Sequence, residues 1–404
     1  MGIIVQKFGG TSLATLKRRN MVVEKIVKAR KNNHLVVVVS AIGRKNEPYS
    51  TDALLGLLNG MEESIVNREL DLLLSCGEVI SGVLLAGLLQ NQGLKAVCLT
   101  GAQAGIVTDN TFGSARIIKV KPETILEFIS KGYIVVVAGF QGITEDREIT
   151  TLGRGGSDTT AAALGVALNA DVIEIYTDVN GLKTADPKIV EEARTLDKVT
   201  YNEICQLAYE GARVIHPRAV EIAMQGNIPI RLKSAFTNEP GTLITNRILP
   251  YEETQIKGDR LITGIAQITD ISQLSITHTR VIDENIKQNL FDVIAKNNIS
   301  IDFINVFPGK VVFTVPDSIA EKAVNLISGL DLQVKVRPGC AKVATVGAGM
   351  TGVPGVMARI VGALNKQNIR ILQSADSYTT IWCLVDNKDM QNAIKALHRE
   401  FGLG

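Results

Sequence analysis

The sequence predicts an α/β protein: a three-layer αβα sandwich around a mainly parallel central sheet, followed by two ferredoxin-like βαββαβ units. Three observations carry this prediction. The chain has 404 residues, enough for two or three domains that each bury a core. Short β-branched runs alternate with stretches of helical periodicity, which is typical of a parallel sheet covered by helices. Two similar helix-to-strand joins, at residues 296–301 and 366–371, indicate an internal repeat near the C-terminus.

The elements of the predicted sandwich follow from these patterns in chain order. Runs rich in Val and Ile predict buried strands at residues 3–7, 35–39, 95–99, 133–138, 172–177 and 228–233. Apolar residues at helical spacing predict helices at 14–31, 68–92, 121–131, 158–169 and 201–225, the last with a break near Pro217. Strands and helices therefore alternate throughout the N-terminal 246 residues.

A polar segment marks the end of the sandwich. Residues 247–260 contain Pro250 and many charges and have little to bury, so we expect a domain at 1–246 and a linker at 247–260. The first ferredoxin-like unit, 272–338, contains all six elements, whereas the second lacks its sixth. Because a spare strand precedes the first unit, we predict that 261–271 joins 339–404 to complete the second unit. The first unit would then be an insertion.

Composition limits the class of partner. The 43 basic and 41 acidic side chains nearly cancel, which argues against nucleic-acid or anionic-membrane binding and favours a small soluble ligand. The uninterrupted apolar runs are too short to span a bilayer, and no signal-peptide pattern is seen, so we expect a cytoplasmic protein. Five scattered cysteines without a CxxC pair and four histidines without ligand spacing predict no transition-metal site on protein side chains.

A glycine-rich bend ends the first predicted strand. In Lys7-Phe8-Gly9-Gly10-Thr11-Ser12, two glycines allow backbone N–H groups to approach a phosphate, and Lys7 supplies a positive charge for a transferring group. These six residues alone are equally compatible with an ordinary glycine turn beside a surface lysine.

A second glycine-rich loop precedes the helix predicted at 158–169. In Gly153-Arg154-Gly155-Gly156-Ser157-Asp158, the guanidinium of Arg154 suits a bidentate grip on a carboxylate. Ser157 and Asp158 are also ordinary helix caps, but capping does not explain an arginine among three glycines.

A third loop, residues 176–188, leaves the predicted strand 172–177 at its C-terminal end, the edge where ligands of open α/β sheets collect. Its Asn-Gly and Asp-Pro pairs on their own are more often plain turns.

Together these segments resemble the amino-acid-kinase family, and within it the aspartate kinases, over nearly the whole chain. The resemblance rests on the two glycine loops, on Gly139-Phe140-Gln141-Gly142, on Thr177-Asp178-Val179 and on Ala185-Asp186-Pro187. The doubled C-terminal unit resembles the paired ACT domains of that family. The resemblance implies ATP-dependent phosphorylation of the β-carboxylate of L-aspartate to 4-phospho-L-aspartate. That reaction is the first step toward lysine or diaminopimelate, threonine and methionine, under feedback control through the ACT domains.

The resemblance also implies roles for individual residues. Lys7 would lie against the transferring phosphoryl group, and Asp158 would orient the surrounding cations, which suits a reaction catalysed by positioning and charge neutralisation. Glu78 would receive the α-amino group of the substrate and Arg154 a carboxylate, so that an opposed pair selects a zwitterion. The other implied substrate contacts are Ser40, Thr51, Gly155 and Ser157. The other implied ATP contacts are Phe8, Gly9, Gly10, Thr177, Asp178, Lys183, Thr184, Ala185, Asp186, Pro187, Lys188 and Arg213.

Some of these positions have simpler explanations or depart from the family pattern. Ser40 fits equally a turn residue at a strand end, and Glu78 fits a solvated charge on a helix. The family usually has tyrosine and arginine where Lys183 and Lys188 stand, and often lysine where Arg213 stands, and these side chains are not interchangeable. Mg²⁺ is expected on the phosphates of ATP, because it keeps several waters and needs few protein ligands.

The ACT resemblance implies an end-product effector, namely lysine, diaminopimelate or threonine, bound where units pair, and at least a homodimer formed through these units. Candidate effector contacts are Asp302, Asn305 and Gln373, although polar residues at strand ends are often simply solvated. The loop at 278–281 lacks the Pro-Gly of the second unit, Pro354-Gly355. Residues 347–352 fit GxGxxG, but only about fifty residues follow, too few for a doubly wound dinucleotide domain.

Three competing functions are disfavoured by the sequence. Another amino-acid kinase, such as a glutamate 5-kinase, is disfavoured by the paired ACT-like units. A catalytically silent amino-acid sensor is disfavoured by the joint presence of Lys7, Glu78, Arg154 and Asp158. A P-loop kinase is disfavoured because no GxxxxGK[ST] occurs in the sequence.

Overall fold

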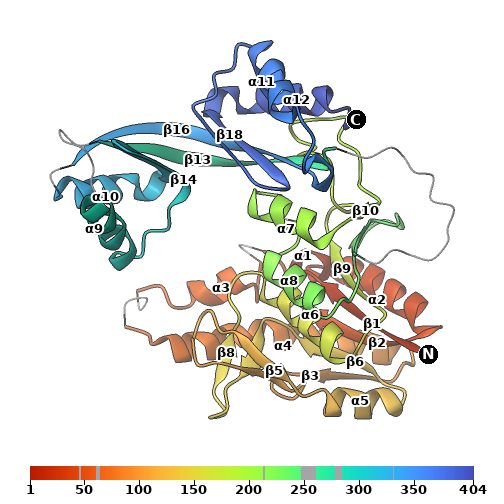
Figure 1. The fold of residues 1–404 in the computed structure, drawn as a ribbon. Helices are drawn as coiled ribbons and strands as arrows, with labels where there is room; N and C mark the ends of the chain where they lie inside the picture. The colour runs from red at the N-terminus through yellow and green to blue at the C-terminus, as the bar shows by residue number, and fades with distance from the viewer. Residues whose placement is uncertain (45–46, 61–63, 213, 247–260, 278–283, 331) are drawn as a thin grey trace. The chain divides into compact units, whose positions relative to one another are not determined.

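The computed structural model describes residues 1–44, 47–60, 64–212, 214–246, 261–277, 284–330 and 332–404 (Figure 1). These residues form two compact units. The first unit comprises Met1–Lys183, Thr195–Tyr209 and the described part of Arg213–Glu253. The second comprises Thr184–Arg194, Glu210–Ala212 and the described part of Thr254–Gly404. The segment predicted as a linker, 247–260, lies outside the described residues.

The first unit is built on an eight-stranded sheet in the order β10-β12-β11-β9-β1-β2-β6-β3. Neighbouring strands are parallel except for the pair β11–β12. The central strands are runs of buried Val and Ile, as expected for strands covered on both faces. In sheet order the strands are β10 (Lys198–Val199), β12 (Thr242–Ile244), β11 (Ile230–Ser234), β9 (Val172–Thr177), β1 (Gly2–Phe8), β2 (Asn33–Val39), β6 (Ile134–Ala138) and β3 (Ala96–Leu99).

Helices cover both faces of this sheet. Helices α2 (Leu16–Arg30) and α4 (Asn67–Asn91) pack on the face that carries Phe8, whereas α6 (Gly156–Ala167) packs on the opposite face, where Gly165 meets Ile173. Helix α8 (Pro217–Gln225) packs against α6 in turn. The predicted three-layer α/β architecture is therefore confirmed. The remaining helices of the unit are α1 (Gly10–Leu13), α3 (Thr51–Gly56), α5 (Glu123–Ser130) and α7 (Tyr201–Tyr209).

A small four-stranded sheet, in the order β5-β4-β7-β8, was not predicted. Its strands have only three or four residues, too short for a periodicity signal. They are β5 (Ile117–Val120), β4 (Ile106–Thr108), β7 (Gln141–Ile143) and β8 (Ile149–Thr151). The buried carboxylate of Asp71 on α4 anchors this sheet, because it accepts the N–H and hydroxyl of Thr151 and the N–H of Gly113.

Helix α4 is the one helix in the described part of the chain with the length and apolar composition that a membrane span would need. Half of its most apolar window is buried inside the first unit. Leu85, Ala86 and Leu89 pack into the same core as Phe8 and the strand β2 valines. These contacts are those of a core helix.

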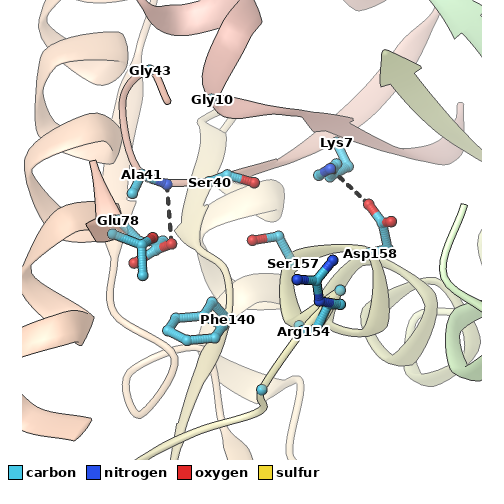
Figure 2. Close-up of a pocket in the computed structure, with 14 residues that line it drawn as sticks. Lys7, Gly10, Ser40, Ala41, Gly43, Glu78, Phe140, Arg154, Ser157 and Asp158 are labelled. Carbon is cyan, nitrogen blue, oxygen red and sulfur yellow. Dashed lines mark hydrogen bonds and ion pairs between the residues drawn. The ribbon is translucent and has the colours of Figure 1, made fainter. Parts of the chain in front are cut away.

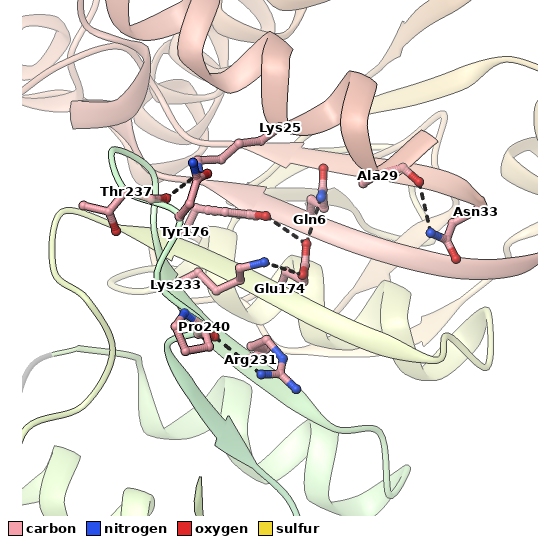
Figure 3. Close-up of polar contacts among 11 residues, drawn as sticks. Gln6, Lys25, Ala29, Asn33, Glu174, Tyr176, Arg231, Lys233, Thr237 and Pro240 are labelled. Atoms are coloured by element: carbon pink, nitrogen blue, oxygen red, sulfur yellow. Dashed lines mark hydrogen bonds and ion pairs between the residues drawn. The ribbon is translucent and has the colours of Figure 1, made fainter. Parts of the chain in front are cut away.

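A buried polar cluster crosses the sheet just below its carboxyl edge (Figure 3). Glu174, at the middle of β9, accepts hydrogen bonds from Gln6 on β1 at 2.8 Å, from Tyr176 at 3.0 Å and from Lys233 on β11 at 3.1 Å. A buried carboxylate is tolerated only with such partners. Because its donors come from three adjacent strands, the cluster ties β1, β9 and β11 together next to Lys7.

The second unit is built on a six-stranded antiparallel sheet in the order β14-β15-β13-β16-β18-β17. Its two central strands, β13 (Gly264–Thr277) and β16 (Gln333–Val346), have 14 residues each. The outer strands are β14 (Asp302–Phe307), β15 (Lys310–Pro316), β18 (Thr380–Asp386) and β17 (Gln373–Asp376). The helices are α9 (Glu284–Lys296), α10 (Asp317–Ser328), α11 (Val356–Asn365) and α12 (Met390–Glu400), with 3-10 turns η1 (Ala348–Met350) and η2 (Asn387–Asp389).

The long strands serve two hydrophobic cores. The first half of β13 pairs with residues 342–346 of β16, and its second half pairs with residues 333–337. Helices α9 and α10 cover one half and α11 and α12 the other, each with its own core. In this pairing the strand that precedes the first ferredoxin-like unit is an integral strand of the second.

The division of the chain differs from the expected continuous domain at 1–246. Two short segments of that range, Thr184–Arg194 and Glu210–Ala212, belong to the second unit. Ala185, Val190 and Ala193 lie in the same core as α11 and α12. Sequence patterns missed this because a few apolar residues inside a polar loop show no periodicity.

A charge cluster around the buried ammonium of Lys342 holds the other segment. Lys342 on β16 lies with its Nζ 3.0 Å from Glu210 Oε2 and 2.5 Å from Asp302 Oδ2. The ring of Trp382 lies beneath the ammonium, 6.0 Å away at its centroid. Burial raises the pKa of the Glu210 carboxyl, and the nearby Lys342 opposes that rise.

Candidate functional site

A cavity of about 480 Å³ lies at the carboxyl ends of β1, β2 and β6 in the first unit (Figure 2). This is the sheet edge at which ligands of open α/β proteins bind. The lining residues come from loops far apart in the sequence, and they are Lys7, Gly10, Ser40, Ala41, Gly43, Thr51, Glu78, Phe140, Gly153, Arg154, Gly155, Gly156, Ser157 and Asp158.

An ion pair forms one side of the cavity. Lys7, the last but one residue of β1, places its Nζ 2.6 Å from Asp158 Oδ1, and the two side chains are only 12% and 13% exposed. Asp158 stands in the first turn of α6, where the helix dipole favours a negative charge. Its other oxygen accepts the backbone N–H of His216 at 3.4 Å. The ammonium of Lys7 is therefore held at the cavity wall by a carboxylate that is itself fixed.

Two glycines are needed where the backbone folds closely around the site. Gly155 caps α6 with φ 73°, and a Cβ there would lie 2.3 Å from the ring of His216. A Cβ on Gly10 would lie 2.4 Å from the carbonyl oxygen of Ala41. Both glycine loops seen in the sequence thus pack against another segment of the site.

Glu78 forms the opposite side of the cavity. It lies in the middle of α4, is 3% exposed, and accepts the N–H of Ala41 on Oε1 at 3.0 Å. Its Oε2 is buried and has no hydrogen-bond partner among the described residues. Burial raises the pKa of this carboxyl to about 8, against a smaller lowering by its backbone hydrogen bonds. A buried oxygen without a donor at a cavity wall is suited to receive a cation.

Arg154 and two hydroxyls lie between these sides. Figure 2 shows Ser40, Ser157 and Arg154 between Glu78 and the Lys7–Asp158 pair. Arg154 is exposed, and within the described part of the chain it has no ion-pair or hydrogen-bond partner. Its guanidinium is free to take an anion. All six residues expected at the substrate, Ser40, Thr51, Glu78, Arg154, Gly155 and Ser157, line this one cavity.

The first residues expected at ATP lie at the same sheet edge. Thr177 ends β9, the strand that pairs with β1, and its Oγ1 accepts the N–H of Val179 at 3.1 Å. Asp178 is ion-paired with the exposed Arg44 at 3.0 Å, and Gly9 lies near the carbonyl of Tyr176. Lys183 donates to Thr195 Oγ1 at 3.3 Å.

The side chain of Phe8 lies where it cannot contact a nucleotide. Its ring is fully buried and stacks on Tyr176 with 4.5 Å between the ring centroids. Only its backbone remains for a phosphate. The core position follows from strand alternation, since Lys7 and Phe8 face opposite sides of the sheet.

The later residues expected at ATP belong to the second unit. The side chains of Thr184 and Ala185 are buried there, whereas Pro187 and Lys188 are exposed. Asp186 Oδ1 accepts the N–H of Lys188 at 2.9 Å. Arg213 lies outside the described residues.

The three candidate effector contacts lie in the second unit and mostly bind protein partners. Gln373 donates to Asn305 Oδ1 at 2.6 Å and accepts from Gln273 at 2.8 Å. Asp302 pairs with Lys342. None of the three lines the cavity of about 790 Å³ in this unit, which is formed by residues 350–357, 376–378 and 381.

That second cavity is lined by Met350, Thr351 and Gly352, the second half of the GxGxxG segment. The segment follows β16 and leads through η1 to α11, inside a ferredoxin-like unit. The segment therefore belongs to a ferredoxin-like unit and not to a doubly wound dinucleotide domain, as its short distance from the C-terminus predicted. The loop expected to differ in the first unit, 278–281, lies outside the described residues.

Sequence reasoning missed Ala41, Gly43 and Phe140 in the lining of the first cavity, and His216 beside it. Phe140 lines it with φ 67°, an unusual conformation for a residue with a side chain. His216 packs its ring on Gly155, and its Nδ1 is buried without a partner in the described residues. Phe140 stands in a segment singled out by the sequence, but no local pattern indicates that it reaches the cavity, and His216 lies behind Gly155 and is not among the lining residues.

Two known protein families match parts of the chain, and a known protein matches all of it. Residues 2–234 match the model of the amino acid kinase family, and residues 335–399 match an ACT domain. The chain is 49% identical over 407 residues to aspartokinase 1 of Bacillus subtilis, and the match covers both proteins completely.

Solved structures of aspartokinases are also similar to this chain over nearly its whole length. Aspartokinase III of Escherichia coli in complex with aspartate and ADP, in its R-state, is 26% identical with a TM-score of 0.78, covering 98% of this chain and 99% of that one. The same enzyme in complex with lysine and aspartate, in its T-state, is 26% identical with a TM-score of 0.77, covering 99% of each chain.

Proposed function

The chain belongs to the amino acid kinase family, among its aspartokinases, and on that premise we propose that it transfers the γ-phosphoryl group of ATP to the β-carboxylate of L-aspartate. Aspartate phosphorylation under ACT-domain control follows from the family itself. The proposal adds the product, 4-phospho-L-aspartate with ADP, and a place at the first step toward lysine or diaminopimelate, threonine and methionine.

One observation carries the assignment of residues. A single cavity holds a buried carboxylate with a free oxygen, Glu78, opposite a buried ammonium, Lys7, with an unpaired guanidinium, Arg154, between them. A zwitterion with two carboxylates fits this arrangement: Glu78 takes its ammonium, Arg154 its α-carboxylate, and its β-carboxylate is left facing Lys7.

The chemistry needs little beyond charge control. An oxygen of the β-carboxylate forms a bond to the γ-phosphorus, the bond from that phosphorus to the bridging oxygen breaks, and ADP leaves without a proton transfer. Two anions must meet, so Lys7 neutralises the developing charge while Asp158 keeps its ammonium in place. Mg²⁺ would be held by the phosphates of ATP, which offer the oxygen ligands that a hard cation prefers, and would neutralise part of their charge.

The regulatory part of the proposal concerns an end-product amino acid. Lysine, diaminopimelate or threonine would act through the ACT units, and the lysine complex of the Escherichia coli enzyme supports this class of ligand. Regulation requires that the effector favour one global state over another.

We also propose a homodimer or higher oligomer formed through the ACT units. Five free cysteines and the use of ATP support work in the cytoplasm.

The test is ADP release measured with aspartate, glutamate and N-acetylglutamate in turn, each with lysine, diaminopimelate and threonine added singly and together. Release with aspartate alone supports the proposal. Equal release with glutamate would favour a broader amino-acid kinase, and no release with any acceptor would favour a silent sensor.

A further inference from the structure

A loop that leaves the first unit is built into the second. Lys183 and Thr195 face each other as an antiparallel bridge in the first unit, and the residues between them, Thr184–Arg194, belong to the second. At the base of the loop, Leu196 donates its N–H to the carbonyl of Leu182 at 2.8 Å. The two ends of the loop therefore lie side by side.

Polar contacts fix the start of the loop from within the second unit. Thr184 is fully buried, and its Oγ1 lies 3.0 Å from Nε2 of His398 on α12. The same oxygen accepts the N–H of Arg194 at 3.2 Å, so its own proton is available to Nε2. The N–H of Ile265 on β13 donates to the carbonyl of Thr184 at 2.8 Å.

The end of the loop is fixed by the C-terminal tail. Arg194 donates from Nε to the carbonyl of Leu403 at 3.1 Å. Between the two ends, Ala185, Val190 and Ala193 share a hydrophobic core with residues of α12 and with Leu403. The buried side of the loop therefore packs with α12 and the tail through these three apolar residues and through its two ends.

The opposite side of the loop is open. Pro187 and Lys188 are exposed, and Asp186 Oδ1 holds the N–H of Lys188 in a local turn. Thr184, Ala185, Asp186, Pro187 and Lys188 are the residues expected at the nucleotide. Of these, Thr184 and Ala185 have buried side chains fixed on the side of α12, whereas Pro187 and Lys188 are open to solvent.

We propose that His398 is a positioning residue for ATP, acting through Thr184 to hold this loop in the conformation that binds nucleotide. This inference rests on the proposed nucleotide role of the loop. Holding a binding segment in its bound conformation lowers the entropy that binding must remove. Loss of the His398–Thr184 bond would weaken ATP binding and leave the aspartate site, formed in the first unit, unchanged.

Two variants remove the bond from its two ends. His398→Leu removes the ring nitrogen, and Thr184→Val removes the hydroxyl while keeping the shape. His398→Gln and Thr184→Ser retain hydrogen-bonding groups and serve as conservative variants if either deletion fails to fold. Gln391→Ala, on the exposed face of the same helix, is the matched control.

Three quantities are measured for each full-length variant: the KM values for ATP and aspartate, kcat, and the Kd of ADP by calorimetry, which needs no turnover. We expect KM for ATP and Kd for ADP to rise about tenfold in His398→Leu and Thr184→Val. We expect KM for aspartate and kcat within threefold of the parent, substantial recovery in Thr184→Ser, and no change in Gln391→Ala.

Two results would overturn the inference. One is an ADP affinity within twofold of the parent in both deletion variants. The other is an equal loss in both KM values together with a lowered Tm, which would mean a structural role only. The calorimetric measurement separates this inference from the proposed reaction: ADP binding that depends on His398 in a protein without aspartate-dependent ADP release would preserve the inference and refute the reaction. Aspartate-dependent release with an ADP affinity independent of His398 would do the reverse.

Discussion

Lys342 and Glu210 form an ion pair inside the second unit, with 3.0 Å between Nζ and Oε2 and with side chains only 5% and 7% exposed. Glu210 directly follows the last residue of α7 and begins the connection to α8. Later in that connection, His216 donates its N–H to Asp158. The pair therefore fixes the segment Glu210–Ala212, which follows α7, inside the second unit.

Removing one member of this pair should be costly. In Lys342→Met, Glu210 is left buried without its cation, and we expect the free energy of unfolding to fall by roughly 3–5 kcal/mol in urea denaturation. Replacing both, in Lys342→Met with Glu210→Leu, should recover much of that loss because no buried charge remains unpaired. The exposed pair Arg359–Glu400 is the control, and Arg359→Met should cost less than about 1 kcal/mol. Equal losses at the two pairs would contradict the assignment of a buried charge.

Lys7→Ala should reduce kcat by about 10²–10³-fold, since it removes the cation that neutralises the transferring group. The aspartate KM should change little, because Glu78 and Arg154 remain. The exposed Lys17→Ala is the matched control and should retain parental turnover. Steady-state ADP release measures both variants, and a loss of only a few-fold in Lys7→Ala would mean that Lys7 is not at the phosphoryl group.

Arg154→Lys should raise the KM for aspartate about tenfold, because a point charge replaces a planar fork that grips both oxygens of a carboxylate. The ATP KM should stay within threefold. Arg147→Lys, at an exposed position outside the cavity, provides the comparison. Unchanged aspartate affinity in Arg154→Lys would rule out the bidentate contact.

Glu78 should make aspartate binding depend on pH. Because burial raises its pKa to about 8, the carboxyl of the free enzyme is mainly protonated at neutral pH. An incoming ammonium favours the carboxylate, so binding below pH 8 must release a proton, and the apparent affinity should rise about tenfold per pH unit up to pH 8. Calorimetric titration with aspartate in two buffers of different ionisation enthalpy counts that proton.

Glu78→Gln provides the control for this effect. The variant should bind aspartate more weakly and with an affinity that does not change between pH 6.5 and 8.5. If the parent enzyme itself shows no proton release over that range, Glu78 does not receive the ammonium.

Much of the first unit could be predicted because its signals are local. Buried parallel strands require apolar runs such as residues 35–39, and glycine loops stand at the strand ends where parallel sheets place their ligands. Glu78 was different: a glutamate within a helix usually faces solvent, and only the family resemblance indicated the cavity.

The features that escaped prediction depend on partners distant in the chain. The loop Thr184–Arg194 packs against α12, some two hundred residues later, and its few apolar residues do not show from the sequence which partner they meet. Asn305 and Gln373 looked available as ligand contacts because the sequence does not show that they bind each other across the sheet. Polar residues are satisfied by whatever the tertiary fold brings to them.

The 14-residue strands β13 and β16 run through both ferredoxin-like halves, so the two halves share their central strands. Unfolding of one half would break the pairing of β13 with β16, which the other half also needs. The two halves should therefore unfold as one cooperative unit. A metabolite that stabilises either half should consequently delay the thermal denaturation of both, by mass action alone.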